Sequence, residues 1–258
     1  MHGKREFPTA KRLLKLLVLV CVAGAVPAAG EDPAAVAARR ATRALEECRA
    51  RWDAATASSE AGWQLARACF DAAEFAPDKA ARGRLAEEGI EAARAVIERC
   101  ATNAPAHYYL ALNLGRLAET KTLGALPLVR EMESHLLRAR ELDPGFDFAG
   151  PDRTLGLLYR DAPGWPLSVG SRKKARRHLD AALDRAPGYP ENRLNRLETR
   201  IQWREKEGAL EDYRAMLALL PQARDRFVGP RWAWSWADWD RRWARAEVQI
   251  HAWFPETR

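Results

Sequence analysis

The sequence predicts an all-α protein built as an array of antiparallel helix pairs. The first observation is a pattern of four positions, in which a small or apolar residue is followed by others four, seven and twelve positions later. The second is that this pattern occurs four times, with its last positions 43, 43 and 34 residues apart. The third is a composition rich in alanine and poor in threonine, which favours helix over strand.

Each copy of the pattern marks the second helix of a pair. A small side chain at a helix crossing lets two backbones approach, and larger residues one and two turns on fill the adjoining space. The proline that ends three of the copies cannot continue a helix. The four copies are Gly89, Ala93, Val96, Ala101; Met132, Leu136, Ala139, Pro144; Ala175, Leu179, Ala182, Pro187; and Ala209, Tyr213, Met216, Pro221.

The period identifies the kind of repeat. A spacing of 34 residues is that of the tetratricopeptide repeat, whose helix pairs stack into a right-handed superhelix. We therefore expect about four such repeats over residues 77–223. Two units carry about nine extra residues, and one insert, Asp161 to Gly170, is rich in Pro and Gly and contains Trp165. This insert falls between the two helices of the third unit.

The first 30 residues have the pattern of a secretory signal peptide. Lys11, Arg12 and Lys15 precede an apolar run from Leu16 to Val26, and small residues follow as far as Gly30. The run is shorter than the ~20 residues that a membrane span needs. We expect an exported, periplasmic protein without a stable membrane span once the signal is cleaved. An uncleaved anchor is the alternative, and lipidation at Cys21 is disfavoured because bulky Val20 precedes it.

The net charge of +7 does not indicate nucleic-acid binding. Residues 1–30 hold five basic residues and one acidic residue, which leaves a net charge of +3 for residues 31–258. Acidic and basic residues are interspersed over that span, as on a solvated helical surface, and no basic and aromatic reading motif occurs.

Residues 31–76 are predicted to form a helical hairpin at one end of the array. One helix runs from Pro33 to about Asp53 and the next from Glu60 to Phe75. Cys48 and Cys69 lie at equal distances from the turn, so they would be neighbours across the hairpin. In an oxidising compartment they are candidates for a disulfide, and buried free thiols are the alternative.

Residues 224–258 are predicted to form a helix that covers the other end. Its tryptophans step by four, three and four residues, as on one face of an amphipathic helix. We expect this stripe to pack on the last repeat, with a partner interface or a membrane surface as alternatives. The stripe consists of Trp232, Trp236, Trp239 and Trp243, continued by Ala246, Ile250 and Trp253, and the opposite face carries Asp238, Arg241, Arg242 and Arg245.

The span from Trp63 to Pro221 resembles the exported tetratricopeptide-repeat proteins related to the T component of TRAP transporters. The resemblance lies in HYYLALNLGRLAE (107–119), LGLLYRDAPGWPLSVGSRKKA (155–175) and APGYPENRL (186–194). It implies a periplasmic helical scaffold. It also implies a periplasmic solute-binding protein as a partner and a homo-oligomer around a hydrophobic pore, as in some members of that family.

In such an array the first helices line a concave face, and this face is the predicted binding site. Three arginines over an apolar floor would suit an extended acidic peptide or an organic acid. The alternative is that these arginines pair with acidic residues of neighbouring helices. The predicted binding residues are Tyr108, Leu112 and Arg116 in the second unit, Arg153, Leu157 and Arg160 in the third, Leu194 and Glu198 in the fourth, and Trp165 in the insert.

The sequence holds no constellation of residues typical of an enzyme. Its histidines are scattered, and no phosphate loop, nucleophile elbow or metal-ligand spacing occurs. His107 is better read as a packed first-helix residue than as a ligand, and Ser171 as a helix N-cap rather than an anion site. We expect a non-enzymatic, cofactor-free adaptor that binds protein or peptide partners. The alternative is an accessory component of a solute transport system that holds a small apolar or anionic ligand.

Overall fold

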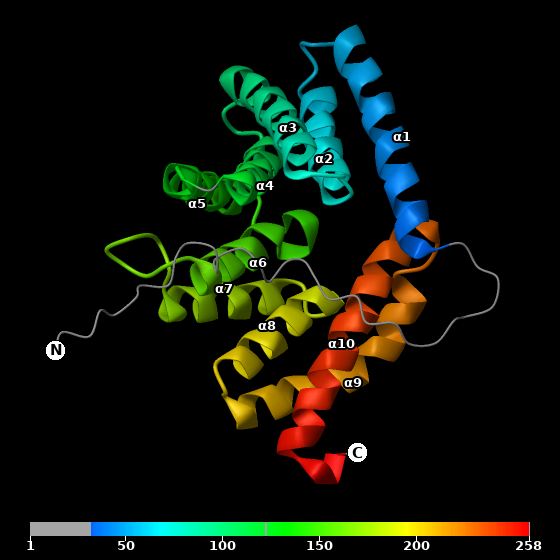
Figure 1. Cartoon of the computed structure of the whole chain (residues 1–258), viewed down its shortest axis with the longest axis vertical. Coiled ribbons are helices and arrows are strands. Elements are labelled where there is room, and N and C mark those ends of the chain that lie inside the picture. The colour runs from blue at the N-terminus through cyan, green and yellow to red at the C-terminus, as the bar shows by residue number, and fades with distance from the viewer. Residues whose placement is uncertain (1–31, 122, 258) are drawn as a thin grey trace, which may run out of the picture.

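The computed structural model describes residues 32–121 and 123–257, and within them the protein is an all-α repeat array (Figure 1), as predicted. The predicted signal peptide lies outside the described residues. The helices are α1 (Pro33–Ala54), α2 (Ser59–Glu74), α3 (Lys79–Arg99), α4 (Ala104–Thr120), α5 (Ala125–Leu142), α6 (Phe146–Asp161), α7 (Arg172–Arg185), α8 (Pro190–Gln202), α9 (Lys206–Arg226) and α10 (Ala233–Trp253).

Short polar side chains begin several of these helices. Ser58, Asp78, Asn103 and Ser171 each accept a hydrogen bond from a backbone N–H of the first turn that has no partner within the helix. Pro221 is the exception to the expected pattern of helix ends. It lies inside α9, which continues to Arg226, so the prediction that it ends this helix is wrong.

Four antiparallel pairs make up the array: α2 with α3, α4 with α5, α6 with α7, and α8 with α9. The first helices of successive pairs, α2, α4, α6 and α8, follow one another along one side. The small residues at the crossings are needed there. A Cβ atom on Gly156 of α6 would lie 2.7 Å from Leu179 of α7, a distance that packed atoms do not tolerate.

The C-terminal helix caps the array, as predicted for the tryptophan stripe. Helix α10 packs on α8 and α9 and forms one apolar core with them, in which Trp239 is 1% exposed and Ile250 is fully buried. Its N-terminal end also reaches the other end of the array (Figure 1). Here Trp234 packs against Phe75 with ring centroids 5.2 Å apart. Helix α10 also contacts α1, so the first and last α-helices of the described chain touch.

The cysteines predicted to pair, Cys48 and Cys69, are buried on α1 and α2 as free thiols. Arg51 donates a hydrogen bond to the sulfur of Cys48 at 3.0 Å. Burial raises the pKa of the Cys69 thiol, which favours its uncharged form. Both buried cysteines pack as small apolar groups. The disulfide stays a prediction for oxidising conditions. Among the described residues, no helix is both long and apolar enough to span a membrane.

Candidate functional site

The most unusual backbone in the described residues opens α6. Asp147, Phe148 and Ala149 have φ angles of 49°, 55° and 64°, so three successive non-glycine residues adopt the left-handed conformation. Each such residue costs about 1–2 kcal/mol relative to the right-handed helix. Strain of this kind persists only where surrounding contacts hold it, and it is typical of functional sites.

Two sequence features of this turn explain its end. Pro151 disfavours right-handed helical geometry in the residue before it, so the helix proper starts after Gly150. Gly150 is required because a Cβ atom there would lie 2.6 Å from the hydroxyl oxygen of Tyr108. The turn therefore presses directly against α4, the first helix of the preceding repeat.

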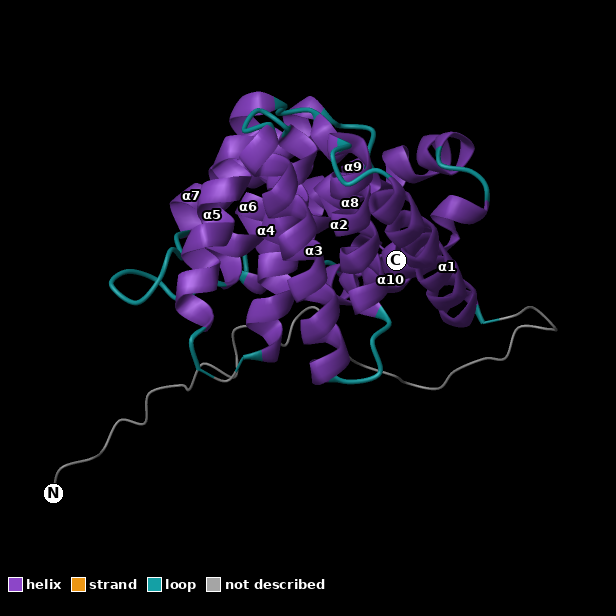
Figure 2. Ribbon diagram, turned by 90° about the horizontal axis from the view of Figure 1, so that it is seen from above, coloured by secondary structure: helices purple, strands orange, loops and turns teal. Residues whose placement is uncertain are grey.

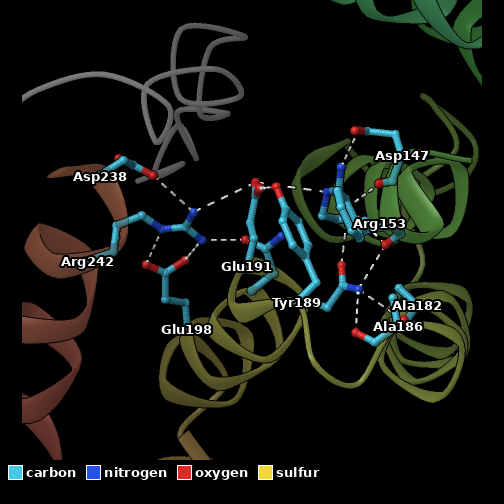
Figure 3. Close-up of polar contacts among 12 residues, drawn as sticks. Asp147, Arg153, Ala182, Ala186, Tyr189, Glu191, Glu198, Asp238 and Arg242 are labelled. Carbon is cyan, nitrogen blue, oxygen red and sulfur yellow. Dashed lines mark hydrogen bonds and ion pairs between the residues drawn. The ribbon is translucent and has the colours of Figure 1, made fainter. Parts of the chain in front are cut away.

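Arg153 holds the turn in place. Its guanidinium donates to the Asp147 carboxylate at 2.6 Å and to the main-chain carbonyl oxygens of Asp147 and Phe148 at 3.0 and 3.2 Å (Figure 3). Asn192 of α8 donates to the same Phe148 carbonyl at 3.0 Å. The Arg153 side chain is only 7% exposed. It is therefore committed to the turn rather than available to a ligand.

Aromatic rings enclose the same arginine. Tyr108 donates its hydroxyl to Asp147 at 3.0 Å, and burial raises the pKa of this hydroxyl, so it stays protonated and acts as a donor. The Arg153 guanidinium lies 5.2 Å from the ring centre of Tyr189. Phe148 stacks on Tyr189 with centroids 4.5 Å apart. The turn is thus tied to α4, α6 and α8 together.

A second buried arginine, Arg242, comes from α10. It binds the Glu198 carboxylate through two hydrogen bonds of 2.9 and 2.7 Å and Asp238 at 3.3 Å. Glu191 lies between the two arginines, 4.0 Å from each (Figure 3). The expectation that Arg242 lies on the solvent face is wrong. It follows Trp239 by three residues, which places it beside the buried stripe.

The same pattern continues toward the N-terminus. Arg116 of α4 pairs with Glu74 of α2, and its guanidinium lies 4.7 Å from the ring centre of Phe70. Asp71 lies one turn before Glu74, and Arg67 approaches it at 3.6 Å. The surrounding helices desolvate Asp71 and Asp147 repels it, which together outweigh Arg67 and raise the pKa of Asp71 to about 6.

These residues form one continuous charged face across α2, α4, α6, α8 and α10. The charged face consists of Asp71, Glu74, Arg116, Asp147, Arg153, Glu191, Glu198 and Arg242. Its basic and acidic members differ in exposure. The three arginine side chains are 7–14% exposed, whereas the five carboxylate side chains are 28–48% exposed. Arg116, Arg153 and Arg242 form an inner layer, and the carboxylates form an outer layer together with Arg67, whose side chain is 57% exposed.

Most of the predicted binding residues lie on or beside this face, in different roles. Tyr108, Arg116, Arg153 and Glu198 belong to it or contact it. Leu112 and Leu157 are half-buried. Arg160 binds the neighbouring Asp161 at 2.7 Å and Thr199 at 3.2 Å. Of the three predicted arginines, Arg116 pairs with an acidic residue of a neighbouring helix, Glu74 of α2, whereas Arg153 and Arg160 pair with Asp147 and Asp161 of their own helix.

Two predicted residues lie elsewhere. Leu194 is completely buried in the apolar core that α8 forms with α9 and α10, so no ligand can reach it. Trp165 is 89% exposed on the loop between α6 and α7 and is not among the residues that line the cavity at the base of that loop. The residues of the charged face that sequence reasoning missed are Asp71, Glu74, Asp147, Glu191 and Arg242.

No metal-binding group appears among residues 32–121 and 123–257, in which no three histidine, cysteine or acidic side chains gather suitably. The closest histidine pair is His107 on α4 and His135 on α5, whose Nδ1 atoms lie 2.8 Å apart. His107 also bonds the Ala101 carbonyl, so it is a packed residue as expected.

Comparison with known proteins gives one partial match. Residues 34–149 match the model of the family "Regulator of microtubule dynamics protein 1-3", which covers α1 to the left-handed turn of α6. No curated protein matches the chain. The similarity therefore supports a helical, protein-interacting chain, and the resemblance to transporter T components has no support beyond the quoted segments.

Proposed function

We propose that this protein is a non-enzymatic scaffold that binds a basic segment of a partner protein across the charged face. Two observations support the binding role. The first helices of a repeat array are the usual contact surface of such arrays. The matched family is named for a regulatory role, which is typical of proteins that act by binding others.

The class of ligand that we propose follows from the arrangement of acidic and basic side chains on this face. A partner that approaches the face meets the carboxylates and Arg67, whereas Arg116, Arg153 and Arg242 behind them are nearly inaccessible and already paired. With Arg67 included, the face holds five acidic and four basic residues, and only one of the four arginines is well exposed. A Lys- or Arg-rich segment is therefore favoured over the acidic peptide or organic acid that the sequence had suggested.

The same geometry distinguishes between two hypotheses, a scaffold that binds proteins and an accessory component of a transport system. A site for a small anionic ligand needs cationic groups that the ligand can reach. Here Arg153 and Arg242 are fixed by internal hydrogen bonds. We infer that the face serves a cationic partner, and the accessory reading would need a different surface.

A peptide-binding measurement tests the proposal. Fluorescence anisotropy would compare a labelled Lys-Ala peptide with a Glu-Ala peptide of equal length. We expect the basic peptide to bind and the acidic one not to bind, with affinity falling as salt rises. The variants Asp71→Asn and Glu191→Gln should each weaken binding several-fold, and Glu256→Gln, an exposed residue beyond α10, should not.

The pH dependence of peptide binding provides an independent test of the same proposal. Because the pKa of Asp71 is about 6, its carboxylate is ionised at neutral pH and becomes protonated on acidification. Binding of the basic peptide should weaken as pH falls below 6, and Asp71→Asn should flatten that dependence. Tighter binding of the acidic peptide, or equal binding of both, would refute the proposed ligand class.

Export is a separate proposal that rests on the sequence of residues 1–30. We propose that the signal is cleaved and that the mature chain begins near Glu31. N-terminal sequencing of protein recovered from the cell envelope tests this directly. A chain that retains Met1 and the apolar run would show that the segment is an anchor or is not processed.

A further inference from the structure

A second surface lies on the loop between α6 and α7. This loop, residues 162–171, projects beyond the helices (Figures 1 and 2). Its tip is apolar: Trp165 is 89% exposed, Leu167 is 64% exposed, and the exposed Pro166 lies between them.

The base of the loop is fixed, so the tip is held outward. Gly170 donates its backbone N–H to the carbonyl of Pro163 at 2.8 Å, and Ser171 donates to Tyr159 at 2.8 Å. Val169 packs against the main apolar core. A loop that only needed to close the connection could fold its tryptophan onto the protein. This one presents the indole to solvent instead.

The protein surface beside the tip of the loop is basic. Helix α7 starts immediately after the loop with Arg172, Lys173 and Lys174, and Arg177 lies one turn further on. Lys174 pairs with Glu133 at 3.2 Å. The other three are exposed and make no ion pair in the described part of the chain.

A cavity opens at the base of the loop between these elements. Its volume is about 350 Å³, and Arg160, Ser171, Arg172 and Trp203 contribute to its lining. The Arg172 guanidinium lies 5.3 Å from the ring centre of Trp203, which keeps it at this position. Of the two arginines that line this cavity, only Arg160 forms an ion pair, with Asp161.

We propose that this loop docks the protein on a lipid bilayer that carries anionic headgroups. Tryptophan prefers the boundary between lipid and water, where an apolar ring with one polar atom is best solvated. Uncompensated lysine and arginine beside it add attraction to anionic lipid. A tip of three side chains exposes roughly a few hundred Å², less than the ~800 Å² per partner of a stable protein interface.

Site-specific quenching on the full chain tests this proposal. A bimane label is placed at Leu167→Cys in a Cys21→Ser, Cys100→Ser background, because the remaining cysteines, Cys48 and Cys69, are buried. The matched control carries the label at Val248→Cys, which is 72% exposed on α10. Both proteins are mixed with vesicles of brominated phosphatidylcholine, with or without phosphatidylglycerol.

We expect anionic vesicles to quench the label at 167 at least about threefold more than the label at 248, and neutral vesicles to quench neither. In the 167-labelled protein, Lys173→Glu with Arg177→Glu should reduce quenching at least about fivefold. The same charge change at Arg84 and Arg214, both exposed and on α3 and α9, should leave it unchanged.

Residues 1–30 are present in every variant, so differences between variants report on the loop. Circular dichroism identical to that of the unsubstituted protein confirms that each variant is folded. Equal quenching at positions 167 and 248, no quenching at either, or quenching at 167 that survives both charge reversals would overturn the proposal.

Discussion

Removal of the Arg153 guanidinium should destabilise the protein more than removal of an exposed arginine. Arg153→Met keeps most of the aliphatic length and abolishes three hydrogen bonds to Asp147 and Phe148. Breaking a buried, hydrogen-bonded charge pair costs about 3–5 kcal/mol. The Asp147 side chain keeps 34% of its exposure, so water can partly solvate it, and we expect the lower end, about 3 kcal/mol.

Urea unfolding followed by circular dichroism measures this loss. A decrease of about 3 kcal/mol should also lower the melting temperature by roughly 6–12 °C for a chain of this size. Arg214→Met on the exposed side of α9 is the matched control, and its effect should stay within about 0.5 kcal/mol.

A double-mutant cycle with Asp147→Asn distinguishes the ion pair from simple packing. If the two side chains stabilise each other, Arg153→Met should cost about 1–2 kcal/mol less in the Asp147→Asn background than in the unsubstituted protein. A loss below about 1 kcal/mol for Arg153→Met, or strictly additive losses, would show that the turn does not depend on this arginine.

Three further outcomes follow from local features. Ala149→Gly should be neutral or should stabilise the protein by up to about 1 kcal/mol, because glycine accepts the left-handed conformation. Ala139→Gly in α5 should cost about 1 kcal/mol. Equal losses of unfolding free energy in chemical denaturation would contradict the left-handed conformation of Ala149. Burial lowers the pKa of His107 and His135. Their contribution to stability is therefore present above pH ~6.5 and is lost as pH falls. Changing both histidines to Gln should make the free energy of unfolding less sensitive to acid. Oxidation should link the cysteines of α1 and α2, and mass spectrometry that finds no two-proton loss would exclude the bridge.

The repeat architecture could be predicted from the sequence because spacing alone determines which residues meet at a helix crossing. Gly156 and Leu179 occupy equivalent places in two helices, and their contact follows from the period. The cap could be predicted for the same reason, since the tryptophan stripe has helical periodicity. These are local patterns, and each helix pair repeats them.

The charged face could be predicted only in part, because its composition depends on contacts between distant segments. Repeat positions place Arg116 and Arg153 on this face, but they carry no information on the internal pairing that buries both side chains. Arg242 arrives from a helix that is not a repeat unit. Its position three residues after Trp239 was the one available signal. Asp147 is oriented by a left-handed turn that Gly150 and Pro151 end, but no glycine marks the three residues that form it.

The order of charge in the face follows from the cost of burying arginine. A guanidinium inside the array must be paired, so every buried arginine requires a carboxylate beside it. The arginine side chain is long, whereas those of aspartate and glutamate are short. An arginine that lies against the core therefore has its carboxylate partners nearer the solvent. Arg153 takes its stacking partner from Tyr189, and Arg116 from Phe70, on the core side of each pair. The exposed carboxylates of this face are therefore a consequence of how the buried arginines Arg116, Arg153 and Arg242 are stabilised.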